Sequence, residues 1–245
     1  MATERMINGR IPSLYNALHL LVFGSTLVIY NLPVIINSRN NARFYSTRGI
    51  FFFTGIAMCV ASIAGLPVSV LEGSVILGFF SLGYSVPVLP FLNKRPLRKL
   101  GWLKTLDLTA VWTIATYVLP VLYWHRAILA LPFEFLLRFV LIFALCVLFD
   151  IRDIRNDLKN NTLTLPHRIG LRNCYRLLYG ATVLFVLLSV LQYLNIHTWW
   201  KLTGALLTAG ALLWVIRYCR SHSSPRVYLG LVDGVMLFYA ILALV

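Results

Sequence analysis

Three of the chain's eight acidic side chains fall within eight residues, at Asp150, Asp153 and Asp157. On an α-helix these positions lie within an arc of about 60°. Arg152 and Arg155 are expected to point to the other side of the helix, so no ion pair within the segment neutralises the acids. Clustered carboxylate oxygens suit Mg²⁺, which typically keeps its waters and shares a phosphate oxygen. The spacing therefore favours a metal–phosphate site, and the alternative is a solvated helix end whose acids pair with distant arginines.

The composition places this segment in a membrane protein. Of 245 residues, 59% are hydrophobic and 12% are charged, and the mean hydropathy is +0.79. A soluble domain carries about 25% charged residues, so soluble, collagen-like, disulfide-rich and disordered classes are excluded. Eight apolar runs approach the length that crosses a bilayer. They predict an all-α polytopic helical bundle, one transmembrane domain over 1–245, with helices at 18–36, 50–66, 70–89, 103–123, 128–149, 174–194, 199–218 and 227–245.

The basic residues predict how the bundle lies in the membrane. Of 22 Lys and Arg residues, 17 follow the first, third, fifth and seventh runs. Cytoplasmic loops carry such an excess, so both termini are expected outside and the acidic segment is expected on the cytoplasmic face. The net charge of +14 then fits contact with anionic membrane lipid rather than nucleic acid.

The segment from Asp150 to Gly170 reads DIRDIRNDLKNNTLTLPHRIG. It closely resembles the second aspartate-rich motif of the UbiA-type intramembrane prenyltransferase superfamily. The shared positions are Arg152, Asp153, Asp157, Thr164, Leu165, Pro166, Arg168 and Gly170. A weaker likeness is the Tyr84-Ser85-Val86-Pro87 element, followed by a basic loop and Lys104.

The resemblance implies a helical bundle, usually of nine helices, that transfers an isoprenyl group from an allylic diphosphate to an aromatic or otherwise lipophilic acceptor. It implies Mg²⁺ as cofactor, bound by Asp150, Asp153 and Asp157, with Asp153 and Asp157 as catalytic residues. The substrate-binding residues that it suggests are Asn31, Arg39, Tyr84, Lys104 and Arg168.

Two features depart from the superfamily. Eight helices are expected here instead of nine, which agrees with an N-terminus outside. The first aspartate-rich motif is also absent: Asn31 remains, but Leu32 and Ile35 stand where acids are expected. Arg39, Arg43 and Arg48 follow and offer guanidinium groups that bind phosphate without metal.

Two further acids fall at the same predicted side of the membrane. Asp107 stands three residues after Lys104 and is expected to pair with it. Asp233 lies inside the last run, either in a functional site or in an ion pair with a loop arginine.

Three functions remain open on these observations. The first is an Mg²⁺-dependent prenyltransferase of altered type. The second is a non-catalytic relative that binds an isoprenoid or quinone, or that serves as a subunit of a membrane complex. The third is a small transporter, for which the sequence shows no inverted repeat.

Overall fold

The structure is a computed structural model. It describes residues 2–8, 16–36, 47–85, 101–159, 162–222, 224 and 227–244. Within these ranges the regular structure is helical. The predictions for Arg39, Arg43, Val86 and Pro87 lie outside the described residues.

The helices follow the predicted apolar runs in order. They are α1 (Ala2–Asn8), α2 (Ala17–Ile36), α3 (Thr47–Ile63), α4 (Val68–Ser85), α5 (Trp102–Thr113) with the π-helical turn η4 (Ile114–Val118) and α6 (Leu119–Tyr123), the short turn η5 (Ile128–Ala130), α7 (Pro132–Lys159), α8 (Leu165–Ile196), α9 (Trp199–Ser221), and the π-helical turn η6 (Tyr228–Val232) with α11 (Asp233–Leu242).

Within the described ranges, eight apolar helical segments are present, as the sequence predicts. Four are long and apolar enough to cross a membrane, namely Trp102–Tyr123, Pro132–Lys159, Leu165–Ile196 and Trp199–Ser221. Four shorter apolar helices accompany them, at Ala17–Leu32, Thr47–Ile63, Val68–Tyr84 and Tyr228–Leu242. The prediction of an all-α polytopic membrane bundle is confirmed.

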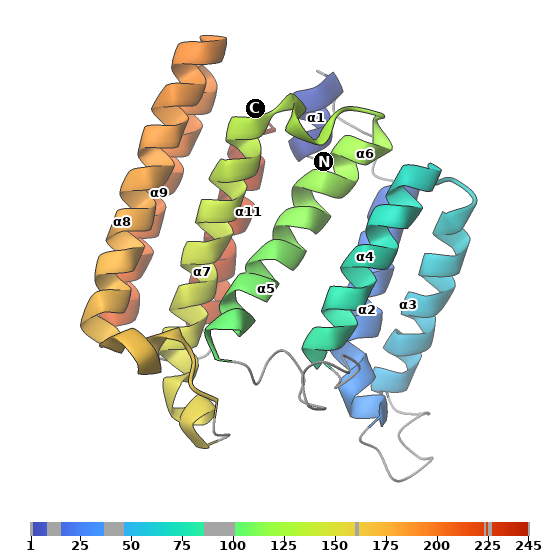
Figure 1. Ribbon diagram of the computed structural model, residues 1–245, viewed down its shortest axis with the longest axis horizontal. Helices are drawn as coiled ribbons and strands as arrows, with labels where there is room; N and C mark the ends of the chain where they lie inside the picture. The colour runs from blue at the N-terminus through green and yellow to red at the C-terminus, as the bar shows by residue number, and fades with distance from the viewer. Residues whose placement is uncertain are drawn as a thin grey trace.

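The bundle has two distinct ends. α1 and the chain's C-terminal end lie at one end, whereas the C-terminal end of α7 and the start of α8 lie at the other (Figure 1). Asp150, Asp153 and Asp157 of α7 therefore lie at the end opposite to both termini. This arrangement agrees with the predicted relation between the acidic segment and the chain termini.

Two apolar clusters hold the helices together. The larger joins α7, α8, α9 and the η6–α11 segment, around fully buried side chains such as Leu148, Phe185 and Ile216. The smaller joins α2, α4 and α6 through Leu18, Val70 and Leu119. α5 lies between these two groups of helices and contacts α7 on one side and α4 on the other.

α2 and α3 approach so closely that their crossing requires glycine. A Cβ atom on Gly24 would lie 2.8 Å from the carbonyl oxygen of Gly55, and one on Gly55 would lie 2.6 Å from that of Gly24. Small residues at such crossings let helix backbones pack tightly in membranes.

A buried polar network ties α1, the α5–α6 segment, α7 and α11 together at the end that carries the termini. Pro120 has no N–H for the carbonyl of Thr116, and that oxygen instead accepts from Thr3 Oγ1 at 2.7 Å and from Arg138 Nη1 at 2.8 Å. Arg138 Nε also pairs with Glu134 at 2.9 Å, and the hydroxyl of Tyr239 donates to the same carboxylate. Arg138, one of the five basic residues that do not follow the first, third, fifth or seventh apolar run, is buried inside the bundle.

Candidate functional site

Lys104 brings together two of the three predicted acids. Its Nζ lies 3.2 Å from Asp150 Oδ1 and 3.1 Å from Asp157 Oδ2. Asp150, which is 2% exposed, also accepts a hydrogen bond from Thr105 Oγ1. Asp150 and Asp157 are seven residues apart on α7, two helical turns, so their side chains share one face. This face meets α5, and the carboxylates converge on the ammonium group that α5 supplies.

Asp153 has a different partner. Arg152 Nε and Nη2 donate to its two carboxylate oxygens at 2.7 and 2.9 Å. The Arg152 guanidinium also lies over the rings of Phe149 and Tyr228, at 4.8 and 5.5 Å from their centroids. The expectation that Arg152 points away from the acids is therefore wrong: a long side chain reaches its neighbour in sequence and forms a two-point ion pair.

The segment after the acids packs on the start of α5. Gly101 has φ of 64°, and a Cβ atom there would lie 2.2 Å from the carbonyl oxygen of Leu163. The same Cβ position is 4.0 Å from Arg168 Nε. Only glycine fits this close approach in a left-handed conformation. The Thr164–Gly170 part of the motif thereby lies beside the helix that carries Lys104, and Arg168 lies exposed near it.

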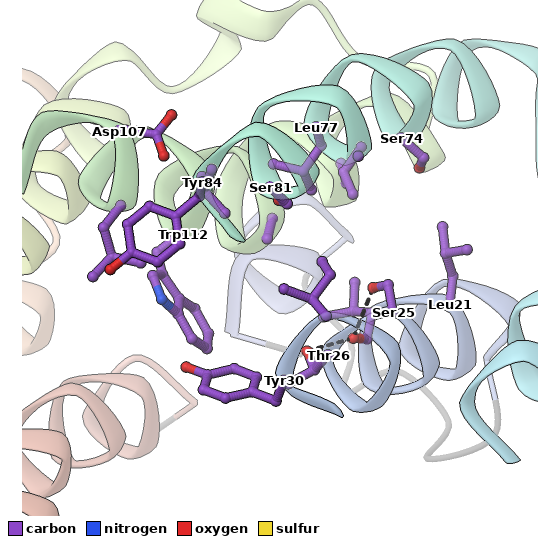
Figure 2. Close-up of a pocket in the computed structure, with 17 residues that line it drawn as sticks. Leu21, Ser25, Thr26, Tyr30, Ser74, Leu77, Ser81, Tyr84, Asp107 and Trp112 are labelled. Atoms are coloured by element: carbon purple, nitrogen blue, oxygen red, sulfur yellow. Dashed lines mark hydrogen bonds between the residues drawn. The ribbon is translucent and has the colours of Figure 1, made fainter. Parts of the chain in front are cut away.

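A cavity of about 370 Å³ opens beside this cluster, between α2, α4 and the α5–α6 segment (Figure 2). Most of its lining is apolar, including Leu21, Leu77, Val111 and Leu119. Cavities of this size and character are typical of binding sites for small lipophilic molecules.

One end of the cavity is polar and aromatic. Tyr84, Tyr30, Trp112 and Asp107 gather there (Figure 2). Asp107 is one helical turn from Lys104 on α5, and the charges of Lys104 and Asp150 act on the hydroxyl of Tyr84. The polar end of the cavity therefore adjoins the Lys104 cluster.

The predicted Lys104–Asp107 pair does not form. The ammonium group of Lys104 is held by Asp150 and Asp157 from α7. Asp107 Oδ2 is buried and has no hydrogen-bond partner within the described part of the chain. A cation that is expected to pair along its own helix is instead engaged across a helix interface.

The other candidate residues make separate contacts and are not part of the Lys104 cluster. Asn31 Nδ2 donates to the carbonyl of Leu27 on its own helix at 2.8 Å. Leu32 is half-buried and Ile35 is buried, and α2 continues to Ile36. Asp233 is exposed at the start of α11, close enough to Arg152 and Tyr30 for an electrostatic effect.

Comparison with known proteins bears on the fold. No protein-family model matches the sequence, and a search of curated proteins finds no match. Among solved structures, the chain is similar to a UbiA homolog from Archaeoglobus fulgidus, described as bound to Cd²⁺. The similarity covers 94% of this chain and 84% of that one, with a TM-score of 0.60 and 12% sequence identity.

The chain has the fold of a UbiA homolog. The architecture that the sequence resemblance implies is therefore confirmed. In this bundle, residues 150–159 and 162–170, which resemble the second aspartate-rich motif, lie at the C-terminal end of α7 and the start of α8, and Leu163 approaches Gly101 at the start of α5.

The carboxylates of this UbiA-type bundle fit a magnesium ion only in part. Among the residues described, no three His, Cys, Asp or Glu side chains come together as a metal site. Asp150 and Asp157, however, converge within 3.2 Å of one cationic nitrogen. Mg²⁺ is often bound by one or two carboxylates together with substrate phosphates. The pair therefore fits a magnesium–diphosphate complex, whereas Asp153 is held by Arg152.

Sequence reasoning missed the side chains that shape the cavity. Tyr30, Ser81 and Trp112 stand inside apolar runs, where aromatic and small hydroxyl residues are ordinary. Trp112, at least, recurs on one face of the α5–α6 segment with Leu108 and Ala115, at spacings of four and three residues. Only the neighbouring positions of α2 and α4 show that this face lines a cavity and does not face lipid.

Proposed function

We propose that this membrane protein binds an isoprenyl diphosphate and transfers its isoprenyl group to a lipophilic acceptor. The observation that carries the proposal is the apolar cavity whose polar end adjoins Lys104, Asp150 and Asp157. A molecule with a hydrocarbon tail and an anionic head fits such a site, because the tail leaves water and the head meets fixed charge. The UbiA-type fold supports the same function.

The charge of the cluster indicates how a diphosphate binds. Asp150 and Asp157 together outweigh the single ammonium of Lys104, so a diphosphate alone would meet net negative charge. When bound by Asp150 and Asp157, Mg²⁺ supplies positive charge that offsets the charge of the diphosphate. Lys104, released from one carboxylate, donates hydrogen bonds to phosphate oxygens, and exposed Arg168 lies near the same helix end.

The reaction proceeds by loss of the diphosphate. The bond between the allylic carbon and the diphosphate oxygen breaks, and its electron pair leaves with the oxygen. Lys104 stabilises the charge that develops there. A nucleophilic atom of the acceptor then forms a bond to the allylic carbon and loses a proton. We place this end of the bundle at the cytoplasmic face because most basic residues follow helices that end there.

A second candidate function is binding without transfer. It is favoured by α2, where Leu32 and Ile35 replace the acids of the first motif and Asn31 bonds to its own helix. With only one pair of carboxylates, we expect measurable diphosphate binding and slow turnover.

Diphosphate release tests the proposal. The purified protein in detergent is given an allylic isoprenyl diphosphate, Mg²⁺ and an extract of lipophilic acceptors, and free diphosphate and prenylated lipid are measured. We expect both products from the parent protein and neither from Asp150→Asn combined with Asp157→Asn. Binding without either product would support the second candidate. Mass spectrometry of co-purified lipids, with and without Mg²⁺, identifies the natural tail.

A further inference from the structure

Two buried polar atoms in the cavity have no hydrogen-bond partner among the residues that the structure describes. They are Oδ2 of Asp107, on α5, and Oγ of Ser81, on α4. Ser81 is only 4% exposed. A buried polar group without a hydrogen bond is costly, and a buried carboxylate without a cation is more costly still. Two such unpaired polar atoms in a cavity wall indicate a ligand that supplies the missing interactions.

The other serine and threonine hydroxyls of the cavity do not share this property. Ser25 Oγ and Thr26 Oγ1 both donate to the carbonyl of Val22, at 3.1 and 2.7 Å (Figure 2). Ser74 Oγ donates to the carbonyl of Val70 at 2.6 Å. Among the serine, threonine and acidic side chains of the described lining, the unmet hydrogen-bonding capacity therefore lies at Ser81 and Asp107, toward the polar end.

The charge and the rings of this end favour a positive guest. Among the described residues that line the cavity, Asp107 is acidic and none is basic. The rings of Tyr84, Trp112 and Tyr30 surround the same region (Figure 2). Aromatic faces attract cations, most strongly where water is excluded. A carboxylate with several rings and the unpartnered hydroxyl of Ser81 matches a cation more closely than a neutral group.

The order of side chains along the α5–α6 segment relates Asp107 to the head and tail of a bound isoprenyl diphosphate. Lys104 is at the diphosphate end, Asp107 follows one turn later, and the apolar lining continues through Val111 and Ala115 to Leu119. From Asp107 to Leu119 the helix rises about 18 Å. An isoprenyl tail that lies along these lining residues, with its diphosphate at Lys104, has its first carbons beside Asp107.

We propose that Asp107, with Ser81 and the rings of Tyr84 and Trp112, is a site for an organic cation at the head of an isoprenyl chain. The inference rests on the proposed function, in which this cation is the allylic fragment left when diphosphate departs. Asp107 holds the positive charge electrostatically and forms no bond to carbon. The acceptor then supplies the electron pair that discharges the cation.

Binding of farnesylamine and farnesol tests the site. The two probes have the same tail, but the amine is protonated at pH 7. We expect the parent protein to bind the amine at least about tenfold more tightly than the alcohol, since hydrogen bonds to charged groups are the strong ones. Asp107→Asn, which keeps the shape, should reduce this preference to about threefold or less, and Ser81→Ala should reduce it partly.

Ser74→Ala is the matched control, because its hydroxyl lines the cavity but already has a partner. It should keep the full preference for the amine, and thermal unfolding confirms that each variant is folded. Equal binding of amine and alcohol by the parent overturns the inference, as does a preference that survives in Asp107→Asn.

This test separates the inference from the proposed function. Suppose that the amine preference depends on Asp107 but the protein binds no isoprenyl diphosphate. That result supports the cation site and contradicts the proposed transferase function. If both hold, Asp107→Asn should slow diphosphate release at least about tenfold while the affinity for an unreactive thiodiphosphate analogue stays unchanged.

Discussion

Replacing Lys104 with methionine tests the buried cluster that organises the site. The change keeps a similar length of side chain and removes the charge. Lys104 is 14% exposed, Asp150 is 3% exposed and Asp157 is 14% exposed at their side chains. Loss of Lys104 therefore leaves two carboxylates facing each other with little water to screen them.

Removing one partner of a buried ion pair typically costs about 3–5 kcal/mol. We expect about 3 kcal/mol for Lys104→Met, because Asp157 retains some contact with water. For a chain of this size that corresponds to a fall in Tm of roughly 6–12 °C. Thermal unfolding in detergent, followed by tryptophan fluorescence, measures the fall.

A double variant, Mg²⁺ and a matched control test the buried cluster further. Combining Lys104→Met with Asp157→Asn should cost less than the two single changes added together, because the residues form one coupled cluster. Mg²⁺ should stabilise Lys104→Met more than the parent, since both carboxylates are then unpaired. Lys159→Met, at an exposed position of the same α7, is the matched control and should unfold near the parent. A Tm for Lys104→Met within about 2 °C of the control would refute the buried cluster.

Three further outcomes are expected. Gly101→Ala should lower stability by about 2 kcal/mol or more, measured by thermal unfolding, because its Cβ would meet the carbonyl of Leu163 at a positive φ. Arg138→Met should cost about 3 kcal/mol by the same assay, because it leaves a buried carboxylate uncompensated, and an unchanged Tm would count against the network. Leu32→Asp combined with Ile35→Asp should raise prenyl transfer if only the first metal site has been lost, and no gain would favour binding without transfer.

The membrane orientation is tested separately. Reporter fusions after residues 95 and 160 should both report cytoplasm, because basic residues follow the helices that end there. A signal from the opposite side at either position would contradict the orientation.

The fold could be read from the sequence because each helix is a continuous apolar run. The eight runs and the eight helical segments agree in order, and most boundaries agree within a few residues. The convergence of Asp150 and Asp157 also followed from helical periodicity alone, since seven residues make two turns.

Contacts between helices were beyond the same reasoning. Lys104 pairs with α7 rather than with Asp107, because α5 packs against α7 at that level. Arg152 turns back to Asp153, which periodicity does not exclude for so long a side chain. The cavity depends on the relative placement of α2, α4 and α5, for which no spacing within one helix gives a signal.

The affinity for an unreactive thiodiphosphate analogue of an isoprenyl diphosphate tests the central proposal most directly. The parent should bind it with Mg²⁺ and lose most of that affinity in a chelator. At about 100 times Kd, the complex should gain about 2.7 kcal/mol of stability. Asp150→Asn combined with Asp157→Asn should abolish the binding, whereas Asp153→Asn should change it by about threefold or less, because Asp153 is held by Arg152. Equal binding without metal, or by the double variant, would contradict the account.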